Sequence, residues 1–251
     1  ENNTWLKDVG TLVVDEAHLL TVPGRGDHLE VGLMKFSQIT PNARIVFLSA
    51  TMPNVRELAE WVSYSLTKKD TFLINSKFRP CPLGMHYEIY YDKGTYDMKE
   101  TEKVHAALQI LQEYPEDKFL VFAHTKRTVQ LAKKWFTEAG IKCEHHNADL
   151  DKAKRHKVEK AFREDPELRV IIATSTLAWG LNMPARRVII LGVHRGLDVV
   201  ETYDIHQMAG RAGRVGLDPR GDVYILLPQS EEDLHYARIG KKRNIESTLL
   251  A

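Results

Sequence analysis

The sequence predicts an α/β fold made of parallel sheets and divided into two lobes, on three observations. Short β-rich runs alternate with helical patterns along most of the chain. Several of these runs are apolar throughout, which is typical of strands in a parallel sheet that helices cover on both faces. The stretch SKFRPCPLG at residues 76–84 interrupts the alternation, because its two prolines and its glycine cannot continue a helix.

The first lobe, residues 1–75, contains three predicted strands and two predicted helices. The strands are TLVVD at 11–15, IVFL at 45–48 and FLI at 72–74, and the helices cover 27–38 and a segment from Asn54. Four apolar residues of the second helix recur at i, i+3, i+4 and i+7: Val55, Leu58, Ala59 and Val62. Three strands are too few for a typical doubly wound sheet, so we expect this lobe to be incomplete at its N-terminus.

The second lobe, residues 85–251, repeats the alternation after the linker at 76–84. Its predicted strands are FLVF at 119–122 and the runs at 169–172, 187–191 and 222–227. Two helices with apolar stripes flank the first of these strands, and the stripes contain Val104, Leu108 and Leu111, then Val129, Ala132, Trp135, Phe136 and Ala139. This lobe is predicted to be complete in itself.

Composition indicates a folded protein without a membrane segment. Thirty-five basic against thirty-four acidic residues leave a net charge of +1, so any contact with nucleic acid must be local. Cys81 and Cys143 lack CxxC spacing and indicate neither a disulfide framework nor a zinc site. No apolar run approaches the roughly 20 residues that cross a bilayer, and no signal pattern opens the chain. We expect an intracellular, soluble protein, cytoplasmic or nuclear depending on its source.

Two carboxylates follow the first predicted strand, at the strand end where open parallel sheets bind ligands. Asp15 and Glu16 begin the run Asp15-Glu16-Ala17-His18. One acidic group there can hold magnesium and another can orient water, as the hydrolysis of a nucleoside triphosphate requires. A given four-residue string also arises by chance, in about one in several hundred chains of this length.

Three further segments follow in order along the chain. Ser49-Ala50-Thr51 comes after the second strand, where it would also suit an ordinary helix cap. TSTLAWGLNMPA at 174–185 follows a later strand. QMAGRAGR at 207–214 carries Arg211 and Arg214 at i and i+3, which a helix would place on one face. Such a pair can reach a triphosphate, although it is also typical of a solvated helix face.

In this order, DEAH, SAT, VFAHT, TSTLAWGLNMPA and QMAGRAGR resemble motifs II to VI of superfamily-two helicases, over nearly the whole chain. LAWGLNMPA, RPCPL and GLDPRGD are similar to the Ski-like branch, which includes archaeal fork-repair helicases, spliceosomal unwinding enzymes and RNA-exosome helicases. The resemblance implies two RecA-like lobes, ATP and magnesium as cofactors, and nucleic acid as the partner.

The resemblance also implies a role for each site residue. Asp15 would hold magnesium through water, Glu16 would be the general base, and His18 would link hydrolysis to the second lobe. Ser49 and Thr51 would couple the lobes, and Gly180 and Asn182 would lie near the nucleotide. Gln207, Arg211 and Arg214 would face the nucleotide, with the arginines stabilising charge in the transition state. The nucleic-acid contacts would come from Thr125, Thr174 and Arg195.

Two departures from the family pattern carry expectations of their own. No GxxxxGK[ST] occurs, and the lone Gly240-Lys241 lies at the wrong end of the chain. We therefore expect these residues to be part of a longer protein and, by themselves, to hydrolyse no ATP. Asp149 stands where the related pattern has glycine, and its carboxylate would repel a phosphate of the nucleic acid.

Several interpretations stay open. The favoured function is 3′–5′ translocation and strand separation on DNA, at a single strand or fork; the alternatives are an RNA helicase and a non-catalytic nucleic-acid-binding module. Residues 194–198 predict a short hairpin, which either separates strands or is a plain surface turn. Histidine ligation of a metal is not expected, since His145 and His146 are adjacent and would face opposite sides of a strand.

Overall fold

The computed structural model describes residues 4–49, 52–76, 78–146, 150–175, 183–241, 245–247 and 249. The chain forms two compact units, one of Glu1–Lys77 with Lys242–Ala251 and one of Phe78–Lys241. Residues 242–251, which the sequence-based division counts with the second lobe, thus group with the first unit. The boundaries of the functional lobes stay a prediction.

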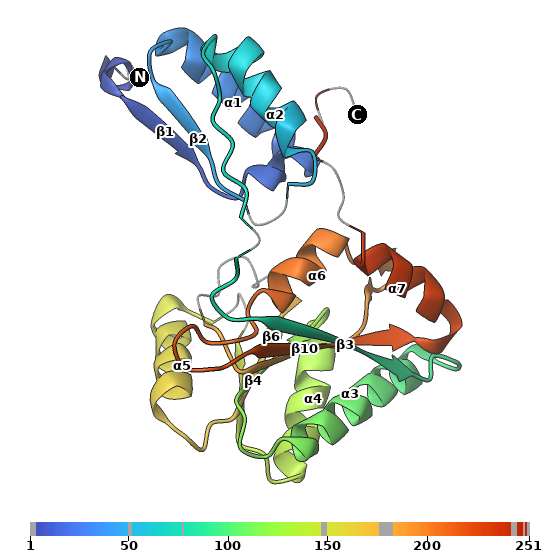
Figure 1. The fold of residues 1–251 in the computed structure, drawn as a ribbon. Coiled ribbons are helices and arrows are strands. Elements are labelled where there is room, and N and C mark those ends of the chain that lie inside the picture. The colour runs from blue at the N-terminus through green and yellow to red at the C-terminus, as the bar shows by residue number, and fades with distance from the viewer. Residues whose placement is uncertain are drawn as a thin grey trace. The chain divides into compact units, whose positions relative to one another are not determined.

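The first unit contains a two-stranded parallel sheet and two main helices (Figure 1). Strands β1 (Thr11–Val14) and β2 (Arg44–Phe47) pair in parallel, and α1 (Gly26–Ile39) connects them. Helix α2 (Val55–Trp61) continues as a π-helical turn, and short 3₁₀ helices cover Thr4–Asp8 and Ala17–Thr21. The predicted strands at 11–15 and 45–48 and both predicted helices are confirmed. The core of the unit consists of Val14, Ala17, Leu20, Leu33, Val62, Leu66 and Ile245.

The predicted strand at 72–74 is wrong. No strand covers these residues, and Phe72 and Ile74 are 95% and 89% exposed. A short apolar run forms a strand only when a neighbouring strand and a face to bury are present. In the described part of the first unit, β1 and β2 pair only with each other, so this run has no such partner.

The second unit contains a six-stranded parallel sheet in the order β3-β10-β7-β4-β6-β5. The strands are β3 (Leu83–Tyr90), β4 (Phe119–Ala123), β5 (Cys143–His146), β6 (Val170–Thr174), β7 (Arg187–Ile190) and β10 (Gly221–Pro228). The four strands predicted for this lobe are confirmed, as is the α/β class with parallel sheets. Apolar runs do not reveal β5, whose sequence is Cys-Glu-His-His.

Alternating side chains of the buried strands build two separate apolar layers. On β4, Phe119 and Val121 face the layer that includes α3 (Tyr96–Glu113) and α4 (Lys126–Glu138). Leu120 and Phe122 face the layer that includes the other three helices (Figure 1), which are α5 (Lys152–Glu164), α6 (Thr202–Ala209) and α7 (Glu232–Ile239). Because helices cover both faces of the sheet, ligands can approach only where strands begin (the amino edge) or end (the carboxyl edge), and open parallel sheets bind them at the carboxyl edge.

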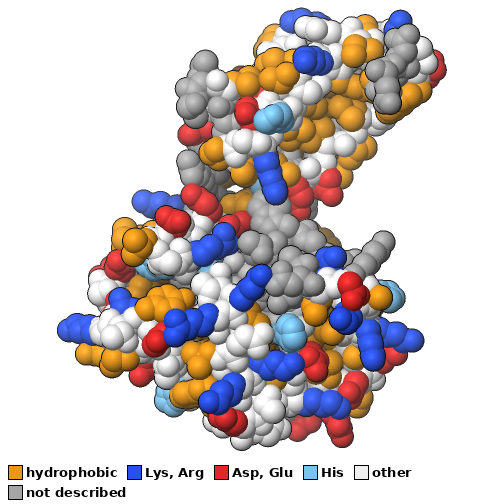
Figure 2. Space-filling model, turned by 180° about the vertical axis from the view of Figure 1, so that it is seen from behind, with side chains coloured by type: hydrophobic (Ala, Val, Ile, Leu, Met, Phe, Trp, Pro, Cys, Tyr) orange, Lys and Arg blue, Asp and Glu red, His pale blue; other side chains and the backbone are white. Residues whose placement is uncertain are grey.

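The surface differs between the two units in character. On the face shown in Figure 2, hydrophobic side chains gather over the first unit, while Lys and Arg side chains are scattered among acidic ones over the second. The exposed apolar residues of the first unit include Val13 at 54% and Ile39 at 46%. No helix among the described residues is long and apolar enough to span a membrane.

Candidate functional site

The two carboxylates of the first unit lie in a tight turn directly after β1. Glu16 adopts a left-handed backbone conformation with φ of 51°, and its amide donates to Asp15 Oδ1 at 2.9 Å. The next amide, of Ala17, donates to the carbonyl of Leu48 at 2.9 Å, which ties the turn to the end of β2. Because left-handed backbone is unfavourable for a residue with a side chain, this turn stores local strain that the neighbouring strand holds in place.

His18 connects this turn to the segment that follows β2. Its Nδ1 lies 3.0 Å from Ser49 Oγ and 3.3 Å from Glu16 Oε2. Burial lowers the pKa of His18 from 6.5 to about 4, although the charge of Asp15 opposes the shift. The imidazole is therefore neutral near pH 7, and its approach to Glu16 is not an ion pair between two charged groups.

The predicted residues of the first unit thus converge at one sheet edge. Asp15 is exposed, the Glu16 side chain is 37% exposed and His18 is buried, so the carboxylates reach solvent above a fixed histidine. Thr51, Gly180 and Asn182 lie outside the described residues.

The expectation that Arg211 and Arg214 share a helix face is wrong. Helix α6 ends at Ala209, and Ala212 instead forms a parallel bridge with Ala185. Gly213 has φ of +89°, a conformation that L-residues rarely adopt and that cannot continue a helix. The two arginines therefore stand on an irregular loop between α6 and β10. This loop lies at the amino edge of the sheet, since α6 must return from the carboxyl end of β7 to the start of the parallel strand β10.

Arg214 is held by Asp218 through three hydrogen bonds. The Arg214 backbone N and Nε donate to Asp218 Oδ2 at 2.8 and 2.9 Å, and Nη2 donates to Oδ1 at 2.8 Å. Burial by itself raises the pKa of Asp218, but these bonds outweigh it and hold that pKa below its ordinary value. The same contact raises the pKa of Arg214, so both groups stay charged.

Gln207 and Arg211 are the other two site residues that the sequence predicts near Arg214, at the amino edge of the sheet. Gln207 lies in the last turn of α6, and its Nε2 donates to the hydroxyl of Tyr203. Arg211 is partly buried, and its backbone carbonyl accepts from Ala185 N at 3.1 Å. The bridge between residues 185 and 212 thus fixes the loop beside the start of β7.

The predicted nucleic-acid residues lie at the opposite, carboxyl edge of the same sheet. Thr174 ends β6, and Thr125 follows the neighbouring strand β4 and caps α4 by accepting from Thr128 N at 3.1 Å. Arg195 Nη2 donates to Ser175 Oγ at 2.9 Å. The structure therefore divides the second unit's predicted residues into two groups, with the arginine loop at one edge and Thr125, Thr174 and Arg195 at the other.

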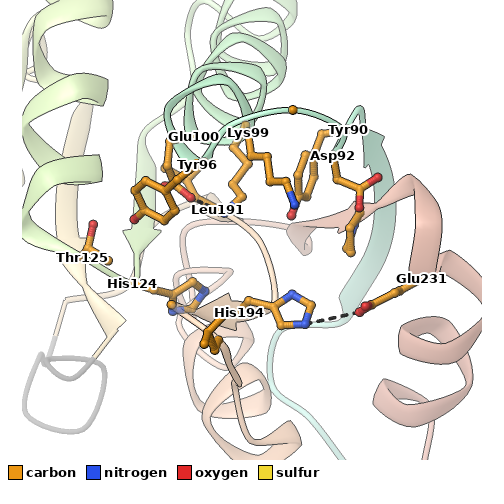
Figure 3. Close-up of a pocket in the computed structure, with 15 residues that line it drawn as sticks. Tyr90, Asp92, Tyr96, Lys99, Glu100, His124, Thr125, Leu191, His194 and Glu231 are labelled. Carbon is orange, nitrogen blue, oxygen red and sulfur yellow. Dashed lines mark hydrogen bonds and ion pairs between the residues drawn. The ribbon is translucent and has the colours of Figure 1, made fainter.

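The predicted hairpin at 194–198 is confirmed. Strands β8 (His194–Arg195) and β9 (Asp198–Val199) pair antiparallel, and Gly196 turns the chain with φ of +64°. A cavity of about 410 Å³ lies beside it at the carboxyl edge, lined among others by Tyr90, Lys103, His124, His194 and Glu231. Figure 3 shows His124 and His194 on one side of this cavity and the tyrosines and Lys99 on the other.

Three possible metal ligands meet beside the hairpin, but their hydrogen bonds indicate a different role. Atoms of His194, Glu231 and His235 lie within 4.8 Å of one another. Arg238 can only donate, and its Nη2 and Nε lie 3.2 and 3.3 Å from His235 Nδ1, so the ring proton belongs on Nε2. That nitrogen bonds Glu231 Oε2 at 2.8 Å. To bind a metal beside Glu231, His235 would need an unprotonated Nε2 and a proton on Nδ1, with a hydrogen-bond acceptor next to Nδ1. Arg238 is a donor and does not fit that arrangement.

Family models match both parts of the chain. Residues 1–58 match the DEAD/DEAH box helicase family, and residues 102–216 match the helicase conserved C-terminal domain. The chain belongs to the superfamily-two helicases.

Three curated relatives of this chain are archaeal proteins. An ATP-dependent DNA helicase Hel308 from Thermoplasma acidophilum is 34% identical, over 90% of this chain and 37% of the relative. A Hel308 from Methanocella arvoryzae is 32% identical, over 91% of this chain and 36% of the relative. A probable ATP-dependent helicase from Methanocaldococcus jannaschii is 31% identical, over 88% of this chain and 27% of the relative. The chain spans about a third of the length of these relatives.

Sequence reasoning about this chain missed two partners of predicted residues. Asp218 follows Arg214 by four positions, a spacing that signals an ion pair only if the segment turns like a helix. Ser175 directly follows Thr174 and bonds Arg195, a residue twenty positions away. No local pattern predicts that second contact, because it depends on how β7 and the hairpin return to the edge of the sheet.

Proposed function

We propose that the chain is part of the motor of an ATP-dependent helicase that moves 3′ to 5′ along DNA and separates its strands. One observation supports this most directly. Asp15 and Glu16 stand at the carboxyl end of β1. His18 Nδ1 hydrogen-bonds Ser49 Oγ, which follows β2, at 3.0 Å and lies 3.3 Å from Glu16 Oε2. Strand ends of this kind bind the phosphates and the metal of nucleotides in open parallel sheets.

The carboxylates suit magnesium and an attacking water. Asp15 is exposed and uses Oδ1 to accept from the Glu16 amide, which leaves Oδ2 for a water molecule of hydrated magnesium. Bound magnesium would neutralise charge on the phosphates. Glu16 is partly exposed, beside a neutral histidine, and would take the proton of the attacking water. Because Ser49 contacts His18, a change at this site on ATP hydrolysis would be transmitted through His18 to Ser49 and so to the rest of the protein.

The second unit would supply cationic groups and strand contacts. Arg211 and Arg214 would stabilise charge on the terminal phosphates in the transition state, with Gln207 beside them. Thr125, Thr174 and Arg195 would contact phosphates of the strand, because they share the carboxyl edge with the hairpin. DNA is the favoured substrate because the Hel308 relatives are described as DNA helicases.

The test uses the natural full-length protein that carries this chain. ATP hydrolysis is measured without nucleic acid and with single-stranded DNA or RNA of one sequence, and strand separation is measured on duplexes with a 3′ or a 5′ tail. We expect stimulation by DNA and separation of the 3′-tailed DNA duplex. Stimulation by RNA alone would make the protein an RNA helicase, and tight binding without hydrolysis would make it a non-catalytic module.

A further inference from the structure

The contact between Arg214 and Asp218 occupies only one edge of the guanidinium group. Asp218 accepts hydrogen bonds from Nε and Nη2, which form the side-on edge of the guanidinium group. It also accepts one from the backbone N of Arg214. Within the described part of the chain, Nη1 has no hydrogen bond or ion pair. The Arg214 side chain is 34% exposed, so the end-on edge of the group can meet a ligand.

We propose that Asp218 is a positioning residue, which holds Arg214 so that its Nη1 edge faces the terminal phosphates of ATP. This inference rests on the proposed function. Arginine binds phosphate oxygens through paired N–H groups, and its long side chain loses much rotational freedom when it does so. A carboxylate that fixes both the backbone and the Nε edge removes this freedom before the nucleotide arrives. Catalysis that depends on position gains from such preorganisation.

Asp218 is itself fixed by the fold. Its side chain is 6% exposed, and its backbone N donates to the Arg214 carbonyl at 2.9 Å, closing a single helical turn. The thiol of Cys81 lies 3.6 Å from the Asp218 carbonyl, and the Arg79 Nη2 donates to the Ala212 carbonyl at 3.4 Å. The segment just before β3 thus braces the arginine loop from its other side.

Cationic and carboxylate groups both surround this loop. Lys118 stands just before β4, and burial and then the nearby charge of Arg214 lower its pKa. Its Nζ donates to the backbone carbonyls of Phe162 and Asp165, the latter at 2.8 Å. Arg186 stands just before β7 and acts electrostatically on Asp218. Asp165 in turn acts electrostatically on Lys118, and Asp117 acts on Arg214. Arg186 pairs with Asp222 at 2.7 Å. Asp218 therefore contributes through the orientation of Arg214 and not through a net positive charge around it.

The experiment measures ATP hydrolysis by the full-length protein at saturating nucleic acid. Asp218→Asn keeps the shape but turns an amide N–H₂ toward the Arg214 donors, which breaks the two-point contact. We expect a fall in kcat of about 100-fold with little change in KM for ATP, since misplacement by about 1 Å costs on that order. Asp218→Glu, which keeps the charge, should retain more activity than the Asn variant. Glu144→Gln breaks the partly exposed ion pair with Lys133 on a different part of the second unit and serves as the matched control, with unchanged kcat.

A double-mutant comparison separates positioning from a general structural role. Lysine cannot form the two-point contact, so Asp218→Asn should cause no further loss in an Arg214→Lys background. Equal losses in both backgrounds, or a loss explained by unfolding in a thermal melt, would overturn the inference. So would a kcat above wild type, because Asp218 would then compete with the phosphate. A wild-type protein without stimulated hydrolysis would instead refute the proposed function, and this inference with it.

Discussion

At the scale of single residues, the conformation of Glu16 matters most for the proposed chemistry. Its left-handed backbone turns the chain sharply after β1 and directs the following amide to the carbonyl of Leu48, just after β2. In the active full-length protein, Glu16→Gln should leave ATP binding largely intact and remove hydrolysis, because the amide keeps the shape but cannot accept a proton. Nucleotide affinity and phosphate release would be measured together. Near-normal turnover would refute the role of Glu16, and Glu60→Gln, at an exposed position of α2, is the control.

Two buried histidines should make folding sensitive to acid. Burial lowers the pKa of His18 and of His124 from 6.5 to about 4, against the hydrogen bond that Gly192 O makes with His124. Between those values the unfolded chain binds more protons than the folded one. The stabilisation that comes from keeping these histidines neutral is therefore fully present above pH 6.5. As the pH drops toward 4, the free energy of unfolding falls by up to about 1.4 kcal/mol per pH unit for each histidine.

This dependence is checked by urea unfolding at pH 7 and at pH 5, with a spectroscopic signal that reports the second unit. The free energy of unfolding is compared between the two pH values. His124→Gln should be destabilising at pH 7, since the Gly192 carbonyl loses its partner, but should narrow the difference between the two pH values. His156→Gln, an exposed change on α5, should leave that difference as it is in the wild type. An unaltered pH dependence in the His124 variant would contradict the assignment.

At the scale of elements, the loop between α6 and β10 depends on Gly213. An added Cβ there would lie 2.4 Å from Cys81 Sγ and 3.0 Å from the Gly221 backbone, at a φ of +89°. Gly216 offers a matched comparison, because its φ is +78° but nothing lies within 4 Å of an added Cβ. Gly216→Ala should cost about 1–2 kcal/mol from backbone strain alone, and Gly213→Ala clearly more. Thermal melts would give both values, and equal costs would show that the close contacts relax freely.

The elements that the sequence predicts best are those whose signal is local. The buried strands β4, β6, β7 and β10 are apolar on both faces, so their runs stand out without knowledge of their neighbours. Residues 72–74 have the same local signal and fail, since a strand also needs a partner. The arginine pair shows the same limit, because Gly213 and the bridge to Ala185 end the helical spacing that the sequence suggested.

At the scale of the whole molecule, the described residues near the C-terminus pack into the first unit. Asn54 Nδ2 donates to the Ile245 carbonyl and Ile245 N donates to Asn54 Oδ1, both at 2.8 Å, and Ser247 Oγ donates to Glu30 at 2.7 Å. Asn54→Ala should release this segment, at a cost of about 1 kcal/mol for each lost bond. Amide exchange at Ile245 would report the release, with exposed Asn42→Ala as the control. Unchanged protection would mean that burial of the Ile245 side chain suffices.

Because the chain leaves the first unit after Lys77 and returns to it at Lys242, the second unit is an insertion within the first. A pulling force applied between Thr4 and Leu249 would load the first unit and bypass the inserted one, as long as the bonds between Asn54 and Ile245 hold. The contact between Asn54 and Ile245 would therefore carry the force and shield the second unit from it. The six-stranded sheet, with its arginine loop and its hairpin, would come under tension only after these two hydrogen bonds had broken.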